Sequence, residues 1–145
     1  MKKALEASQI ILDRTNFDGN TAVVLGSGLG GFTDALTDSE LIEYSDIPHY
    51  PRSTVEGHSG EMVIGRLMNK EIIIAKGRMH LYEGYSKETV VFPIHVLKEC
   101  GIENLIITNS AGSLDKINLP AVLVCFSNFS LPSESTVQNL EIILE

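Results

Sequence analysis

Two segments of the sequence hold polar donors at a spacing suited to binding an anion, and the first is a glycine-rich loop. The loop, Gly26–Gly31, directly follows the apolar run Thr21–Leu25. Because glycine has no side chain, the backbone N–H groups of such a loop can approach an anion closely. Ser27 adds a hydroxyl donor within the loop. This pattern indicates a turn at the end of a strand that could hold a phosphate-like group.

The second segment places an arginine, a histidine and a tyrosine at alternate positions. Arg78, His80 and Tyr82 come directly after the apolar run Ile72–Lys76. In an extended backbone, alternate side chains point to the same side, so these three donors would face one site. The planar fork of the arginine matches the geometry of a phosphate group. We therefore predict a phosphate-like ligand at the carboxyl ends of neighbouring strands, where open α/β sheets bind their ligands.

The glycine loop taken alone leaves two other interpretations open. Its Gly-x-Gly-x-x-Gly pattern matches the dinucleotide-binding fingerprint, which also needs an acidic residue about 20 positions further on. Glu43 lies roughly there, but residues 47–76 predict a proline-containing loop and a hairpin instead of further parallel crossovers. No lysine follows the last glycine, so the Walker phosphate-loop pattern is absent. The other interpretation is a tight turn from strand to helix that binds no ligand.

The hydrophobic pattern predicts the elements that must position these segments. The spacing of apolar residues predicts helices over residues 3–15 and Lys87–Cys100, and a short helix that begins within Phe32–Leu36. Because helical and strand-like runs alternate, with one hairpin inserted, we predict a mixed α/β fold with a central β-sheet and flanking helices. The predicted strands of this sheet are Thr21–Leu25, Met62–Leu67, Glu71–Lys76 and Asn104–Thr108. Further patterns indicate strands at Leu41–Tyr44 and Pro120–Phe126 and a final helix at Ser133–Leu144.

The length and charge of the chain limit the kinds of protein to which it can belong. The chain has 145 residues, 43% of them hydrophobic and 21% charged, which is typical of a single soluble globular domain. Its net charge is −8 and its basic residues do not cluster, so we expect no nucleic-acid partner. No apolar run approaches the ~20 residues of a membrane span. The start of the chain lacks the apolar core of a signal peptide, so we expect no membrane association and a cytoplasmic location.

The cysteines and most of the histidines do not form a metal-binding pattern. Cys100 and Cys125 are not spaced as metal ligands, and we interpret both as reduced, buried, small apolar residues. We interpret His49, in the proline-containing loop, and His95, on a predicted helix, as structural or solvent-facing. His58 differs because it stands close to glycines on both sides, which would give it freedom to approach a ligand. The residues therefore predict no metal site, and His58 joins the candidate site residues.

Five blocks of sequence, in this order, resemble the purine nucleoside phosphorylase family of the trimeric type. The resemblance covers about residues 1–114. Methylthioadenosine phosphorylases are relatives of this family, but the fourth block favours the purine nucleoside branch. The blocks are Val24–Gly30, Ile47–Pro51, Val55–Gly60, Gly77–Tyr85 and Thr108–Gly112.

The resemblance implies an activity and a set of partners. The implied reaction is reversible phosphorolysis, in which a purine nucleoside or deoxynucleoside and inorganic phosphate give the free purine and (deoxy)ribose 1-phosphate. Phosphate is then a co-substrate, and the resemblance implies neither a metal nor another cofactor. It also implies a homotrimer.

The resemblance further implies roles for individual residues. The implied phosphate-binding groups are Ser27, Arg78, His80 and the backbone N–H of Ser110. Tyr82 would contact the ribose, and Ala111 and Gly112 would line the purine pocket. His58 would lie near the phosphate and the sugar, and His58 and His80 are the predicted catalytic residues. Neutral donors with one arginine suit a site that holds a phosphate dianion beneath a sugar on which positive charge develops.

The resemblance ends after Leu114. We expect a single truncated phosphorylase domain over residues 1–145, in which residues 1–114 are family-like and residues 115–145 form a divergent tail. In the family, the acidic residue and the asparagine that bind the purine come from a second half, and no residue here matches them. Two hypotheses follow. The chain is a purine nucleoside phosphorylase by descent, or it is a non-catalytic fragment that retains only the phosphate-binding half of the site.

Overall fold

A computed structural model describes residues 2–51 and 60–109 of the chain. The chain divides into two compact units, Met1–Ser110 and Ala111–Glu145, and the described residues all belong to the first. The prediction of a single domain over the whole chain therefore stays a prediction. The predicted features outside the described residues are His58, Ser110, Ala111, Gly112, Cys125, the strand at Pro120–Phe126 and the helix at Ser133–Leu144.

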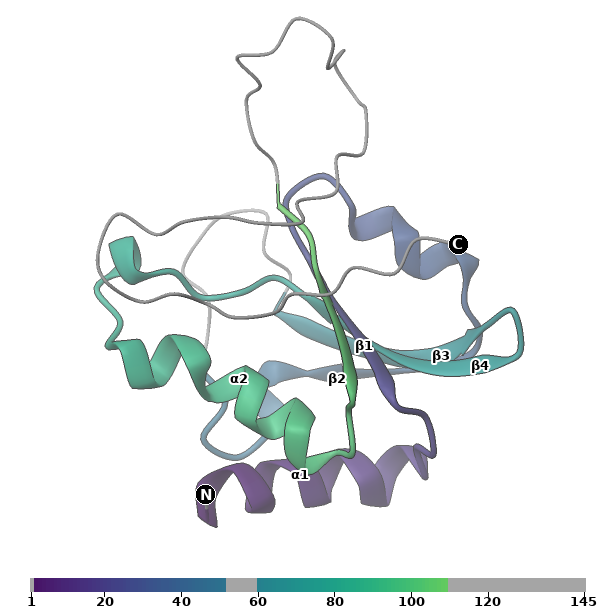
Figure 1. Ribbon diagram of the computed structural model, residues 1–145, viewed down its shortest axis with the longest axis horizontal. Helices are drawn as coiled ribbons and strands as arrows, with labels where there is room; N and C mark the ends of the chain where they lie inside the picture. Colours follow the sequence, from purple (N-terminus) through teal and green to yellow (C-terminus); the bar gives the residue numbers. More distant parts are fainter. Residues whose placement is uncertain (1, 52–59, 110–145) are drawn as a thin grey trace, which may run out of the picture. The chain divides into compact units, whose positions relative to one another are not determined.

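The first unit is built around one mixed sheet of five strands. The order of the strands across the sheet is β2-β3-β4-β1-β5 (Figure 1). The four strands that the sequence assigns to a central sheet all lie in it, which confirms the predicted mixed α/β fold. The strands are β1 (Thr21–Leu25), β2 (Thr37–Glu43), β3 (Glu61–Leu67), β4 (Lys70–Lys76) and β5 (Asn104–Ile107).

Strand β1 lies between two parallel neighbours. It pairs with β4 so that Leu25 is opposite Lys76, and with β5 so that Val24 is opposite Ile107. All three strands therefore end at the same edge of the sheet, which we call the carboxyl edge. The glycine loop, the Arg78 segment and the segment that begins at Thr108 follow these three strand ends. The topology thus brings three separate parts of the sequence to one place.

The predicted hairpin between β3 and β4 is present and has a two-residue turn. Met68 and Asn69 have positive φ angles of 48° and 65°, which are typical of a type I′ turn. The turn sets a register in which Glu61 is paired with Lys76. This register fixes where β4 ends and hence where the Arg78 segment begins.

Two helices cover one face of the sheet. Helices α1 (Lys2–Thr15) and α2 (Lys87–Glu99) contact each other (Figure 1) and match the predicted ranges closely. Ser86 caps the N-terminus of α2, because its Oγ accepts a hydrogen bond from the N–H of Thr89 at 3.2 Å. The main core forms between these helices and the sheet. Its fully buried members include Ala7, Ile11, Ala22, Ile42, Met62, Ile73, Val96 and Leu97.

Three expectations about the segment after β1 need correction. The predicted strand at Leu41–Tyr44 begins earlier, because β2 spans Thr37–Glu43. The short helix after the glycine loop is a 3-10 helix, η1 (Gly30–Ala35). The dinucleotide-binding alternative is wrong, because β2 lies at the far edge of the sheet and pairs antiparallel with β3. The physical reason is that η1 is too short for the helical crossover that a parallel neighbour requires.

Cys100 is a buried, free thiol at the end of α2. It is 6% exposed and forms no disulfide. Burial, with a smaller effect from Glu99, raises the pKa of the thiol to about 12, so it stays neutral near pH 7. The interpretation of Cys100 as a reduced, apolar core residue is confirmed.

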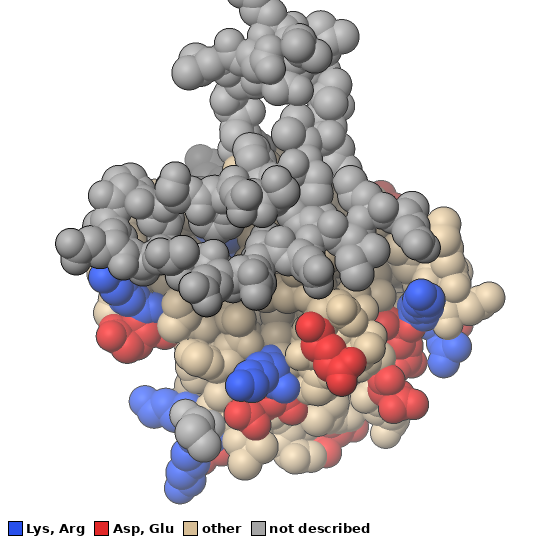
Figure 2. Space-filling model, in the orientation of Figure 1, with Lys and Arg blue, Asp and Glu red and all other residues tan. Residues whose placement is uncertain are grey.

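The surface of the protein carries charges of both signs. Figure 2 shows lysine and arginine side chains interspersed with aspartate and glutamate on the face that it presents. With a net charge of −8, the chain has no global attraction for an anion. An anion site must therefore be made by local donors. None of the helices in the described part is both long enough and apolar enough to cross a membrane.

Candidate phosphate-binding site

The glycine loop leaves β1 in close contact with the segment that follows β5. The N–H of Gly26 donates to Oγ1 of Thr108 at 2.9 Å. A Cβ atom at Gly26 would lie 2.8 Å from the Thr108 carbonyl oxygen and 2.9 Å from Cα of Asn109, so only glycine fits. Beyond it, Ser27 is exposed and Gly28 has a φ of 86°. The predicted use of the loop's N–H groups for an anion does not extend to Gly26, whose N–H holds the loop in place.

We expect Gly26→Ala to lower the free energy of unfolding by about 1–3 kcal/mol, because the added methyl group overlaps backbone atoms. Urea denaturation followed by circular dichroism measures this loss. Gly30→Ala is a matched control in the same loop, because its Cβ would meet its nearest atom, Cε of Lys76, at 3.9 Å. The control should change stability by no more than about 0.5 kcal/mol. Equal losses in the two variants would contradict the close approach at Gly26.

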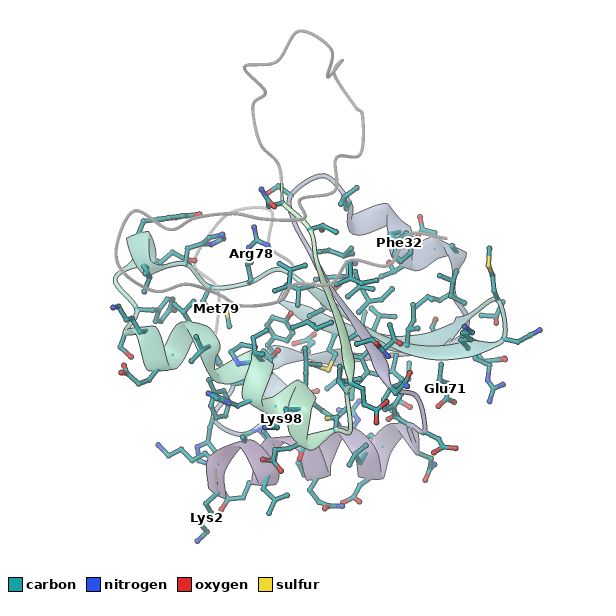
Figure 3. All side chains as sticks on the ribbon, in the orientation of Figure 1. Lys2, Phe32, Glu71, Arg78, Met79 and Lys98 are labelled. Atoms are coloured by element: carbon teal, nitrogen blue, oxygen red, sulfur yellow. The ribbon has the colours of Figure 1, made fainter. Side chains whose placement is uncertain are left out.

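Two hydrogen bonds within the protein help to hold Arg78 at the carboxyl edge. Its Nη1 donates to the carbonyl oxygen of Thr108 at 2.6 Å, and its Nε donates to Nε2 of His80 at 3.3 Å. Figure 3 shows Arg78 at the end of the sheet opposite to Glu71 and Lys98. A hydrogen bond from a charged donor is short and strong, so the bond to Thr108 ties the guanidinium to the end of β5. The guanidinium is therefore oriented at the strand ends by contacts within the protein.

His80 is itself oriented by a buried carboxylate. Its Nδ1 lies 3.2 Å from Oε1 of Glu83, and the same oxygen accepts the backbone N–H of His80 at 2.8 Å. The Glu83 side chain is only 3% exposed. We assign the imidazole proton to Nδ1, which leaves Nε2 as the acceptor for Arg78. In this arrangement both ring nitrogens of His80 have partners within the protein, and His80 orients Arg78. Its contact with phosphate stays a prediction, and that contact requires Nε2 to carry a proton and to exchange Arg78 for the anion.

Tyr82 stacks on His80. The ring centroids are 4.7 Å apart with an angle of 20° between the ring planes, and Tyr82 is 75% exposed. The expectation of an extended segment through Tyr82 is wrong beyond His80, because Leu81–Glu83 forms a 3-10 turn, η3. The turn forms because the Glu83 side chain folds back onto His80, and it exposes Leu81 while Met79 stays buried. Stacking nevertheless keeps Tyr82 beside His80.

The turn that precedes Arg78 is held by a buried tyrosine. The hydroxyl of Tyr44 donates to the carbonyl oxygen of Gly77 at 2.9 Å. Gly77 has a φ of 95°, a backbone conformation that favours glycine. Burial raises the pKa of Tyr44 well above its ordinary value, so the hydroxyl keeps its proton and remains a donor. Tyr44 therefore helps to set the direction in which the chain enters the site.

The structure brings three of the predicted site residues to the carboxyl edge. Ser27 follows β1, and Arg78 and His80 follow β4, its parallel neighbour. Thr108 connects the two groups, since it contacts both Gly26 and Arg78. The convergence of these side chains on one cavity stays a prediction. The predicted residues at 58 and 110–112 lie outside the described ranges.

Three residues that organise the carboxyl edge were not among the predicted site residues. Glu83 could have been found, because a glutamate three residues after His80 has the spacing of a capping box. Thr108 belongs to one of the family-like blocks, but no local pattern shows that it reaches β1. Tyr44 is 33 residues away from Gly77 in sequence, and only the tertiary structure places them in contact.

The arrangement suits an anion better than a cation. The guanidinium of Arg78 supplies the positive charge, and the acidic side chain beside it, Glu83, is directed to His80. Lys76 forms an ion pair with Glu61 at 2.9 Å, so its charge is balanced nearby. Among residues 2–51 and 60–109, no three histidine, cysteine, aspartate or glutamate side chains are grouped as metal ligands. The edge can hold a tetrahedral anion through one arginine and neutral donors.

Comparison with known sequences identifies the family to which the chain is similar. The model of the Phosphorylase superfamily matches residues 20–134. The chain is 41% identical over 123 residues to purine nucleoside phosphorylase 1 of Geobacillus stearothermophilus. This alignment covers 85% of this chain and 45% of that protein. The chain is 48% identical over 93 residues to purine nucleoside phosphorylase 1 of Bacillus subtilis, in an alignment that covers 64% of this chain and 34% of that protein. The chain thus spans less than half the length of these relatives.

Comparison with solved structures confirms the fold. A purine nucleoside phosphorylase of Schistosoma mansoni solved with acetate superimposes with a TM-score of 0.74 and 35% identity, covering 81% of this chain and 43% of that one. A purine nucleoside phosphorylase solved with ribose 1-phosphate gives a TM-score of 0.73 and 36% identity, covering 80% of this chain and 43% of that one.

Proposed function

Because this chain belongs to the phosphorylase superfamily, we propose that it provides the phosphate-binding part of a purine nucleoside phosphorylase active site. The observation that carries the proposal is the position of Arg78 at the carboxyl edge. Its guanidinium is held between the Thr108 carbonyl and the His80 ring, next to the glycine loop. A relative of the same fold was solved with ribose 1-phosphate, which is the product that phosphorolysis of a ribonucleoside would release.

In the proposed reaction, a phosphate oxygen forms a bond to C1′ of the sugar as the glycosidic C–N bond breaks. The electron pair of that bond leaves with the purine, which takes up a proton. Positive charge develops on the sugar during this step, and a phosphate dianion beside the sugar stabilises it. The site must hold the dianion without protonating it. A guanidinium and neutral donors meet this requirement, because an arginine does not lose its proton in proteins.

The proposal gives each candidate residue a task. Tyr82 offers an exposed ring beside His80, and this supports its assignment to the sugar. We also infer a homotrimer, as the family resemblance implies, and a cytoplasmic location, as expected above. The proposed catalytic residues are His58, near the phosphate and the sugar, and His80. The proposed binding groups are Ser27, Arg78, His80 and the N–H of Ser110 for phosphate, Tyr82 for the sugar, and Ala111 and Gly112 for the purine.

Titration of the full 145-residue chain with inorganic phosphate in a calorimeter tests the proposal. We expect a Kd in the millimolar range, about −4 kcal/mol, because the anion is held by one arginine and a few donors near solvent. Sulfate, a dianion of the same shape, should compete with phosphate. Chloride at equal ionic strength is the control and should not compete. A folded protein that shows no saturable heat with phosphate would overturn the proposal.

A further inference from the structure

Thr108 is the point at which three chain segments of the candidate site meet. Its Oγ1 accepts the N–H of Gly26 at 2.9 Å and donates to the carbonyl oxygen of Val24 at 3.2 Å. Its backbone N–H also donates to the Val24 carbonyl, at 3.0 Å. Its own carbonyl oxygen accepts Nη1 of Arg78 at 2.6 Å. One residue thus joins the end of β1, the start of the glycine loop and the arginine after β4.

The hydroxyl extends the sheet beyond its last regular pair. Strand β5 ends at Ile107, opposite Val24. The N–H of Gly26, just after β1, therefore needs a hydrogen-bond partner outside the regular pairing of the two strands. A hydroxyl group can accept one hydrogen bond while it donates another. The Thr108 hydroxyl does both, because it accepts from Gly26 and donates to Val24. An aliphatic side chain of the same shape could make neither bond. It would leave the half-buried N–H of Gly26 without its partner.

The two bonds of the hydroxyl also bear on Arg78. They hold the Thr108 backbone against β1, and the carbonyl of that same residue is the acceptor that orients the guanidinium. A shift of Thr108 would therefore move the glycine loop and Arg78 together. Such a shift would weaken anion binding even though the glycine loop and the guanidinium both keep their donors, because binding depends on the relative position of these donors.

We propose that Thr108 is a positioning residue that sets the glycine loop and the Arg78 guanidinium in the relative geometry that binds a phosphate group. The proposal rests on the proposed function, because phosphate is the anion assigned to this edge. Thr108 acts through Gly26 and Arg78 and has no contact with the anion itself. A purely structural role would stabilise the end of β5 and leave anion affinity unchanged.

The test compares two substitutions in the full chain. Thr108→Val removes the hydroxyl and keeps the shape, whereas Thr108→Ser keeps the hydroxyl. Thr21→Val is the matched control, because Thr21 lies at the opposite end of β1 and its hydroxyl donates to Oδ1 of the adjacent Asn20. Two quantities are measured by NMR: the hydrogen-exchange rate of the Gly26 amide without ligand, and the affinity for inorganic phosphate. Thermal unfolding confirms that each variant is folded.

We expect Thr108→Val to accelerate Gly26 exchange and to weaken phosphate binding, each by about tenfold or more. Thr108→Ser should restore both quantities, and Thr21→Val should change neither. Unchanged Gly26 exchange in Thr108→Val would overturn the proposal, and so would faster exchange with unchanged phosphate affinity. If Thr108→Val does not fold, Thr108→Ala removes the hydroxyl without adding a group and is judged by the same two outcomes.

The same experiment separates this proposal from the proposed function. If the unsubstituted chain binds no phosphate, the proposed function fails, and the Gly26 exchange rate alone decides the role of Thr108. Faster exchange in Thr108→Val, rescued in Thr108→Ser, would then support its positioning of the loop. Unchanged exchange would overturn that role as well.

Discussion

Substitution of Arg78 by alanine is expected to abolish phosphate binding. The guanidinium is the positive group that the fold holds at the carboxyl edge, through the Thr108 carbonyl and the His80 ring. Hydrogen bonds to charged groups contribute about 1.5–3 kcal/mol each, so affinity should fall by at least about tenfold. A millimolar site weakened to this extent gives no saturable heat. Calorimetric titration with phosphate measures the loss.

Two further variants separate the local role of Arg78 from its charge. Arg66→Ala removes an equal charge from β3, where Arg66 is half exposed and lies 3.5 Å from Glu71 near the hairpin turn. It should titrate like the unsubstituted chain. Arg78→Lys keeps the charge but loses the planar fork, so an intermediate affinity is expected. A folded Arg78→Ala protein with an unchanged titration would contradict the assignment of Arg78 to phosphate.

A second large effect is expected in catalysis. A polypeptide of these 145 residues alone should turn over purine nucleosides at least about 10²-fold more slowly than the ~10 s⁻¹ median of enzymes. The described residues at the carboxyl edge are proposed to hold phosphate, whereas departure of the purine also needs a proton or a hydrogen bond on the base. Glu83, the acidic side chain beside the site, is 3% exposed and directed to His80. Release of hypoxanthine from inosine in the presence of phosphate is the measurement.

The positive control for this assay is purine nucleoside phosphorylase 1 of Geobacillus stearothermophilus, the longer relative of which this chain spans 45%. Phosphate binding without turnover would support the hypothesis of a phosphate-binding half-site. Turnover within about tenfold of the enzyme median would contradict the expectation. It would show that residues 110–145, or a second chain, complete the purine site. Arg78→Ala should remove any turnover that is observed.

Local patterns in the sequence were sufficient for most of the elements. Continuous apolar runs located the four predicted strands, because strands such as β1, β3 and β4 are buried on both faces. Helical spacing located α1 and α2, because each helix buries one face. The hairpin followed from two apolar runs with a short polar connection. The family-like blocks correctly indicated the phosphorylase superfamily. The contact between His80 and Glu83 is also local, because the two residues have the spacing of a capping box.

The sequence by itself thus determined that four of its segments form strands of one sheet and which family the chain belongs to. Only the tertiary structure decided that β2 pairs at the far edge, that Tyr44 supports Gly77 and that Thr108 joins Gly26 to Arg78. The physical reason is that the hydrogen bonds of Thr108 to β1 span 82 and 84 residues of sequence. Such bonds depend on strand order and register, and these arise from the packing of the whole sheet, not from the periodicity of any one segment.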